Sequence, residues 1–135
     1  MTSKASILIV EDDPGLRHVH EIFFDHQGFQ LSTVTNGEDA LKRIEAHDYD
    51  VIVLDIGLPG IDGLEVLKAI RQTSDVPVIV MTARTDIQSI NQVFALGAND
   101  YLNKPFRPEI LLKRIEVVLA DPKSKPGLKA LHTAR

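Results

Sequence analysis

Residues 6–13 read Ser-Ile-Leu-Ile-Val-Glu-Asp-Asp, an unbroken apolar run that ends in three acidic residues. Such a run is typical of a strand buried on both faces of a parallel sheet. Residues 51–54 (Val-Ile-Val-Leu) and 76–81 (Val-Pro-Val-Ile-Val-Met) have the same character. We therefore predict three central parallel strands, an edge strand at the more polar residues 29–34, and a short strand at residues 100–103.

Five amphipathic segments alternate with these strands and predict helices. The first opens with Asp13 as N-cap and Pro14 at the first helical position, and it ends before Gly28. We expect Val19 of this helix and Ile87 of the fourth helix to be buried. Alternating strands and helices predict an α/β fold with right-handed crossovers. The expected form is a doubly wound, flavodoxin-like, five-stranded parallel sheet in the order 2-1-3-4-5, with helices on both faces.

The composition restricts the classes of function. The chain has 135 residues, no cysteine and a net charge of −4. This length fits one domain, and the lack of cysteine excludes disulfides and thiolate chemistry. A negative charge disfavours direct binding to nucleic acid, which needs a basic excess. No segment approaches the roughly 18 apolar residues that span a bilayer, so we expect a cytoplasmic protein without membrane contact.

The composition changes after residue 120, where Asp-Pro-Lys-Ser-Lys-Pro-Gly has the character of a linker. Residues 121–135 contain four basic residues and one acidic residue, which gives this segment a charge of +3. We predict a domain at residues 5–120, followed by a basic linker or tail at residues 121–135.

Polar residues follow the ends of the predicted strands, namely Glu11 and Asp12 after the first, Asp55 after the third, Thr82 after the fourth and Lys104 after the fifth. In open α/β sheets, ligands bind beyond the carboxyl ends of the strands, where the strand order reverses. In the order 2-1-3-4-5, this point lies between the first and third strands. We therefore expect these side chains to meet at one edge of the sheet.

Neighbouring carboxylates repel and raise one another's pKa, so this cluster needs a counter-charge. Mg²⁺, or Mn²⁺ in its place, prefers oxygen ligands, and Lys104 adds a further positive charge. An ionised Asp55 beside a divalent cation and an ammonium group is suited to attack a phosphoryl group and form an aspartyl phosphate. The residues alone thus predict metal-dependent phosphoryl chemistry.

Four segments carry a resemblance to a known family: ILIVEDDP at residues 7–14, VLDIGLPGIDG at 53–63, VMTA at 80–83 and GANDYLNKPF at 97–106. Together they resemble the receiver domains of bacterial two-component response regulators, over about residues 5–119. The resemblance implies that a sensor histidine kinase or a histidine phosphotransfer protein donates a phosphoryl group. It also implies that the domain catalyses its own phosphorylation and slow dephosphorylation, without being an enzyme.

The resemblance implies a role for each matching residue of the site. Asp55 matches the phosphoacceptor, and Glu11 and Asp12 match the acidic metal pair. The main-chain carbonyl of Gly57 matches the remaining metal ligand. Lys104 matches the phosphate-binding lysine, and the peptide bond that follows it is cis in most of the family.

Two further residues match the switch of the family. Thr82 matches the hydroxyl that moves toward the phosphoryl group, and Tyr101 matches the aromatic ring that then turns inward. This movement repacks the surface of the fourth helix, fifth strand and fifth helix, which is a shift between two populated states.

Two features concern phosphoryl lifetime and docking. Gly57 replaces a larger side chain often found there, and Arg84 could cover the phosphoryl group instead, so both residues are candidates for setting its lifetime. The resemblance places kinase docking on the first helix, where Gly15, His18 and an outward-facing Ile22 are the candidates.

Several alternatives stay open or are disfavoured. A degenerate receiver would act as an interaction module without phosphorylation. A phosphatase of the haloacid-dehalogenase type needs an acid two residues after the nucleophile, where this chain has Gly57. A flavodoxin-like cofactor site would place a phosphate against three acids, which repel it. A nucleotide hydrolase needs a phosphate-binding loop motif that is absent.

The output is also open between a stand-alone switch and the N-terminal part of a longer regulator with an output domain or effector partner. The linker composition favours the second. Asp100 and Arg114 resemble regulators with winged-helix DNA-binding outputs, which form homodimers through the fourth helix, fifth strand and fifth helix. Ile110 departs from that pattern, because those regulators usually carry an acid there.

Overall fold

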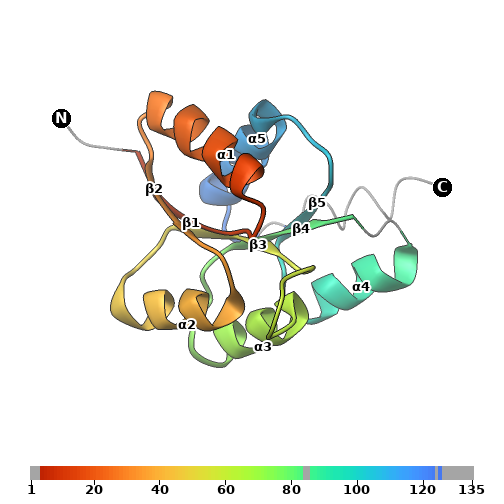
Figure 1. The fold of residues 1–135 in the computed structure, drawn as a ribbon. Helices are drawn as coiled ribbons and strands as arrows, with labels where there is room; N and C mark the ends of the chain where they lie inside the picture. The colour runs from red at the N-terminus through yellow and green to blue at the C-terminus, as the bar shows by residue number, and fades with distance from the viewer. Residues whose placement is uncertain (1–3, 84–85, 124, 126–135) are drawn as a thin grey trace.

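A computed structural model describes residues 4–83, 86–123 and 125 (Figure 1). Strands and helices alternate along the described chain, in the order β1 Ser6–Val10, α1 Pro14–His26, β2 Gln30–Val34, α2 Gly37–Ala46, β3 Val51–Asp55, α3 Gly63–Thr73, β4 Val78–Thr82, α4 Ile87–Ala95, β5 Asp100–Asn103 and α5 Pro108–Ala120. The predicted strand at residues 76–81 thus begins two residues later, after Pro77, which has no N–H to donate to a sheet.

The sheet is five-stranded and parallel in the order β2-β1-β3-β4-β5, which confirms the predicted topology. β1 pairs with both β2 and β3, so the direction in which strands are added to the sheet changes after β2. The registers align the carboxyl ends of the strands: Val10 pairs with Leu54, and Thr82 pairs with Asn103. Residues that follow these positions therefore lie at one edge of the sheet.

The helices cover both faces of the sheet (Figure 1). α1 and α5 lie on one face, where Phe24 and Ile115 join the alternate strand residues Ile7 and Ile9 in one core. α2, α3 and α4 lie on the other face, over the strand residues that point the opposite way. Because β1, β3 and β4 are covered on both sides, their apolar runs are unbroken in the sequence.

The helix boundaries follow local signals. The Asp13 carboxylate accepts hydrogen bonds from the N–H groups of Gly15 (2.9 Å) and Leu16 (3.4 Å), which confirms it as the N-cap of α1. Gly28 follows α1 with a φ of 86°, a left-handed conformation that favours glycine. These bonds fix where the loop after β1 ends and α1 begins.

The expectation that Val19 and Ile87 are buried is wrong: they are 47% and 64% exposed. On α1, His20 takes the inward position instead, one helical turn from Phe24. Ile87 is the first residue of α4, and helical side chains lean toward the preceding turn. No turn precedes Ile87, so the periodicity that buries Ile90 does not bury Ile87.

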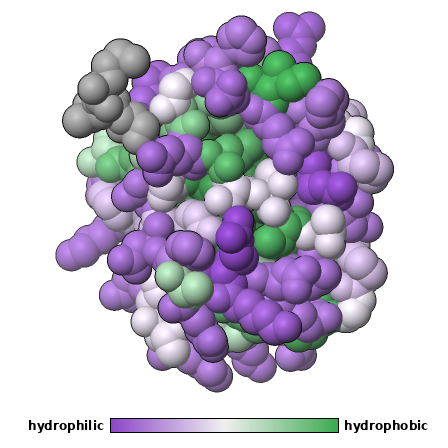
Figure 2. All heavy atoms as spheres, turned by 60° about the vertical axis from the view of Figure 1, so that its left-hand side comes forward, coloured by the Kyte–Doolittle hydropathy of each residue, from purple (hydrophilic) through white to green (hydrophobic). Residues whose placement is uncertain are grey.

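The face of the molecule shown in Figure 2 is predominantly polar. Figure 2 brings forward the side of the molecule that carries β2, and its apolar residues form small separate patches among hydrophilic ones. Among the described residues, no helix is both long enough and apolar enough to cross a membrane.

Candidate functional site

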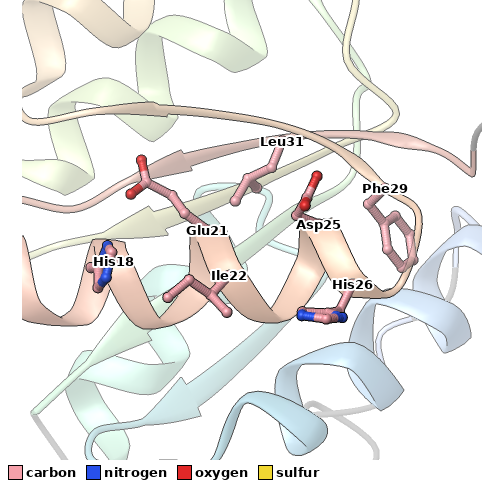
Figure 3. Close-up of a pocket in the computed structure, with 7 residues that line it drawn as sticks. All are labelled: His18, Glu21, Ile22, Asp25, His26, Phe29 and Leu31. Carbon is pink, nitrogen blue, oxygen red and sulfur yellow. The ribbon is translucent and has the colours of Figure 1, made fainter.

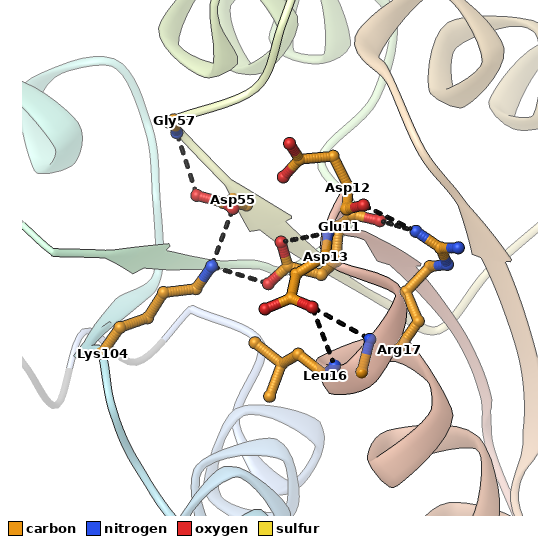
Figure 4. A network of polar contacts seen from close by, with 9 residues as sticks. Glu11, Asp12, Asp13, Leu16, Arg17, Asp55, Gly57 and Lys104 are labelled. Atoms are coloured by element: carbon orange, nitrogen blue, oxygen red, sulfur yellow. Dashed lines mark hydrogen bonds and ion pairs between the residues drawn. The ribbon is translucent and has the colours of Figure 1, made fainter.

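The carboxyl edge of the sheet brings three carboxylates together. Glu11 and Asp12 follow β1, and Asp55 ends β3, the neighbouring strand. One oxygen atom from each of the three side chains lies within 4.8 Å of the others. Glu11 is fully buried and Asp55 nearly so, whereas Asp12 is exposed (Figure 4). The sequence-predicted cluster therefore forms, with one member open to solvent.

Lys104 supplies the positive charge of this cluster (Figure 4). Its Nζ atom lies 2.6 Å from Oε1 of Glu11 and 2.8 Å from Oδ2 of Asp55. Its main-chain N–H donates to the carbonyl of Thr82 at 2.8 Å, which fixes the start of the loop after β5. The Lys104–Pro105 peptide bond is cis, as the family resemblance implies.

Both oxygens of Asp55 have partners. Oδ2 pairs with Lys104, and Oδ1 accepts a hydrogen bond from the N–H of Gly57 at 2.9 Å. The Gly57 main chain is thus folded back over the Asp55 carboxylate. Gly57 itself is exposed, and a Cβ atom there would lie 3.5 Å from Asp55 Oδ1, an ordinary contact.

The electrostatics of the site show a shortage of positive charge. Burial, together with the nearby Asp55 carboxylate, raises the pKa of Glu11 to about 7, although the contact with Lys104 opposes this shift. Burial lowers the pKa of Lys104, but its hydrogen bonds to Asp55 and Glu11 outweigh burial and raise that pKa overall. One ammonium group faces three carboxylates. An oxygen-rich cluster of this kind fits a hard divalent cation such as Mg²⁺.

Thr82 and Tyr101 lie on neighbouring strands beside the cluster. Thr82 ends β4 and is buried, whereas Tyr101 is half-buried on β5. Tyr101 pairs in register with Val80, which lies two residues before Thr82, so the two side chains face the same helix layer. The Tyr101 ring packs edge-on against Phe94 of α4, with 5.9 Å between ring centroids. This contact joins β5 to α4.

The docking candidates are exposed but lie in two places. Gly15 lines a pocket beside the site together with Lys104 and Pro105. His18 and Ile22 line a different pocket, on the outer side of α1 (Figure 3). Ile22 is 50% exposed, which confirms its outward orientation. The candidate Arg84 lies outside the described residues.

Two residues near the site were missed by the sequence analysis. His20 is fully buried, and its ring stacks on Phe106 with 5.8 Å between centroids. Burial and the charge of Lys104 lower the pKa of His20 to about 4. The available signal was its spacing of four residues from both Leu16 and Phe24. Arg17 was also missed, and it donates to the main-chain carbonyls of Glu11 and Asp12.

Comparison with known proteins gives a consistent result. The family model of the response regulator receiver domain matches residues 7–116. The transcriptional regulatory protein AfsQ1 of Streptomyces coelicolor is 42% identical over 114 residues, which cover 84% of this chain and 51% of AfsQ1. The response regulator ArlR of Staphylococcus aureus (strain Mu50) is 41% identical over 113 residues, which cover 84% of this chain and 52% of ArlR.

A solved structure agrees with these sequence relatives. The receiver domain of the Francisella response regulator 1452 has a TM-score of 0.84 and 30% identity, and the match covers 89% of this chain and all of that one. This chain spans about half the length of AfsQ1 and ArlR. Family match, relatives and fold together show that the chain belongs to the receiver domains of two-component response regulators.

Proposed function

We propose that this domain accepts a phosphoryl group on Asp55. The observation that carries the proposal is the position of the Asp55 carboxylate, which is buried at the sheet edge between the other acids and the Lys104 ammonium. Its Oδ2 atom is held by Lys104 and its Oδ1 atom by the Gly57 N–H, so the carboxylate is fixed in position beside a positive charge.

The same site is proposed to hold Mg²⁺ or Mn²⁺. The ligands would be the carboxylates of Glu11, Asp12 and Asp55 and the main-chain carbonyl of Gly57. When bound, the cation neutralises charge on the transferring phosphoryl group. The fit is supported by the clustered carboxylates: burial, together with the neighbouring Asp55 carboxylate, raises the pKa of Glu11.

The proposed reaction transfers the phosphoryl group from a histidine of the donor to Asp55. A carboxylate oxygen of Asp55 forms a bond to phosphorus while the bond between phosphorus and the donor's histidine nitrogen breaks, and that nitrogen keeps the electron pair. Lys104 is proposed to stabilise the phosphoryl oxygens, because its ammonium already lies 2.8 Å from the Asp55 carboxylate. The domain thereby catalyses its own modification.

The expected phosphoryl donor is a sensor histidine kinase or a histidine phosphotransfer protein in the cytoplasm. The exposed residues Gly15, His18 and Ile22 on α1 are proposed docking contacts. Gly15 fits this role most directly, because its pocket also contains Lys104 of the reacting site. His18 and Ile22 would contact a more distant part of the donor (Figure 3).

The proposed output surface is α4-β5-α5. Thr82 would turn toward the phosphoryl group, Tyr101 would turn inward, and the contact between Tyr101 and Phe94 would carry the change to α4. Ile110 and Val117 of α5 are 43% and 44% exposed, which supports a homodimer or an effector contact there. Since α5 ends at Ala120, we propose residues 5–120 as the domain and residues 121–135 as a basic linker or tail, of which residues 124 and 126–135 lie outside the described residues.

The deciding experiment is intact-mass measurement after incubation with acetyl phosphate and Mg²⁺. We expect one phosphoryl adduct on the wild-type chain, and none on Asp55→Asn or after metal removal. A folded, Mg²⁺-binding protein without an adduct would contradict the proposal and indicate a degenerate receiver. Continuous release of phosphate at many turnovers per minute would instead indicate a phosphatase.

A further inference from the structure

We propose that Arg17 is a positioning residue for the acidic pair, holding the loop after β1 so that Glu11 and Asp12 meet at the metal site. The Nη1 atom of Arg17 donates to the carbonyl of Glu11 at 3.1 Å and to the carbonyl of Asp12 at 2.9 Å (Figure 4). The inference rests on the proposed function only in assigning a metal to the site.

The loop held by Arg17 is short and carries two of the three acidic residues of the site, Glu11 and Asp12. It runs from Glu11 to Asp13, between the end of β1 and the start of α1. The main-chain N–H of Arg17 donates to the carbonyl of Asp13 at 3.0 Å as part of the first helical turn. One residue therefore binds three consecutive carbonyl groups, two through its side chain and one through its main chain.

Asp12 depends on this contact more than Glu11 does. The Glu11 carboxylate is buried, pairs with Lys104 and accepts a hydrogen bond from the N–H of Asp13 at 3.3 Å. The Asp12 carboxylate is exposed, and the described part of the chain gives it no hydrogen bond or ion pair. Its position is therefore set by the main chain of its own loop, which Arg17 restrains at the Asp12 carbonyl.

Because Arg17 is positively charged, the direction of the change in the Kd for Mg²⁺ distinguishes two possible roles of this residue. A cation beside a metal site repels the metal, so loss of its charge alone would strengthen Mg²⁺ binding. Loss of a residue that positions the ligands would weaken binding instead, as is usual when a group that orients metal ligands is removed. The two roles predict opposite changes in the Kd for Mg²⁺.

The experiment compares Arg17→Met, which keeps the apolar stem but has no donor, with Arg17→Lys, which keeps one charged donor group. Isothermal titration calorimetry with Mg²⁺ alone gives the Kd for each variant of the 135-residue chain. We expect Arg17→Met to raise the Kd by about 10-fold, and Arg17→Lys to lie closer to the wild type. Lys113→Met, which removes an exposed charge on α5, is the matched control and should leave the Kd unchanged.

Hydrogen exchange of the metal-free protein provides a second readout. In Arg17→Met, we expect the amides of Asp13, Gly15 and Leu16 to exchange faster than in the wild type, with no change in β3. An unchanged or lower Kd together with unchanged exchange would overturn the inference. If the wild type binds no Mg²⁺, the proposed metal site fails, while the exchange rates still decide whether Arg17 holds the loop. If Arg17→Met does not fold, Arg17→Lys provides the test. Exchange rates and a Kd equal to those of the wild type would then contradict the inference.

Discussion

The ammonium nitrogen of Lys104 lies 2.6 Å from Oε1 of Glu11, although these residues follow β5 and β1, with β3 and β4 between them in the sheet. The lysine side chain thus extends across the strand ends and pairs with a carboxylate that has no exposed surface. This ion pair links the edge strand β5 to the inner strand β1. It also neutralises part of the negative charge of the acidic cluster.

Removal of the Lys104 ammonium should destabilise the metal-free domain. In Lys104→Met, two buried carboxylates lose their partner, and we expect the free energy of unfolding at pH 8 to fall by about 2 kcal/mol. Urea unfolding measures this change, with Lys104→Arg as the charge-preserving control. Saturating Mg²⁺ should recover part of the loss. Equal stability of Lys104→Met and wild type without metal would show that the pairs contribute nothing.

Glycine is required at position 63 but not at position 57. A Cβ atom on Gly63 would overlap with the Cα of Ile56 and lie 2.7 Å from the carbonyl oxygen of Asp55, both main-chain atoms that cannot move aside. We expect Gly63→Ala to cost about 2 kcal/mol of stability and to displace the loop that carries Gly57.

The matched variant is Gly57→Ala, whose Cβ would meet only Asp55 Oδ1 at 3.5 Å. We expect a stability within about 0.5 kcal/mol of the wild type, as for most surface substitutions. Thermal and urea unfolding of both variants test the contrast. Similar losses of stability in Gly63→Ala and Gly57→Ala would mean that the close approach at Gly63 is not the cause of the loss.

His20 should make stability depend on pH. Its pKa is about 4 in the folded protein, because of burial and the charge of Lys104, against 6.5 for an unperturbed histidine. A lowered pKa contributes stability that is complete above pH 6.5 and is lost as the pH falls toward 4. The full loss is about 3 kcal/mol.

The variant His20→Phe keeps a ring against Phe106 and removes the titrating group. We expect its stability to fall less than that of the wild type between pH 6.5 and 4, as measured by urea unfolding at several pH values. His18→Gln, at an exposed position of the same helix, should keep the wild-type slope. Parallel pH profiles for His20→Phe and wild type would contradict the prediction.

Arg71 should be important for stability at the opposite edge of the sheet. Its guanidinium donates to the carbonyls of Gly97, Ser74 and Val76 and to Oδ1 of Asn99, at 2.7 to 3.2 Å. Arg71→Ala leaves these acceptors without their charged donor, and we expect a loss of about 3 kcal/mol by urea unfolding.

Lys68→Ala provides the comparison for Arg71→Ala, because Lys68 is exposed on the same helix. We expect it to change stability by less than about 0.5 kcal/mol. If both substitutions cost the same, the loss reflects helix α3 itself and not the contacts of the guanidinium.

The sequence predicts most of the fold, because the apolar runs of β1, β3 and β4 are long enough to identify strands covered on both faces. It also predicts the acidic cluster, since residues that follow parallel strands share one edge. Val19 and Ile87 were predicted wrongly because periodicity does not show that His20 takes the inward position on α1 or that Ile87 is the first residue of its helix.

The contacts of His20 and Arg17 could not be predicted, for different reasons. The spacing of His20 from Leu16 and Phe24 indicates an inward position, but its ring stacks on Phe106, a residue far along the chain that no local pattern identifies. Arg17 binds main-chain carbonyls, and these are present at every residue of any sequence. The sequence identifies which side chains could carry the chemistry, whereas the residues that orient them depend on loop geometry.

The segment after α5 is attached far from the acidic edge. Nδ2 of Asn99 donates to the carbonyl of Pro122 at 2.7 Å, and Nζ of Lys125 donates to the carbonyl of Ala98 at 2.8 Å. Asn99 precedes β5 and Lys104 follows it, so the attachment and the acidic edge lie at opposite ends of this strand, about 16 Å apart along the extended chain. A displacement of β5 at the acidic edge would therefore also move the point where the segment after α5 is attached.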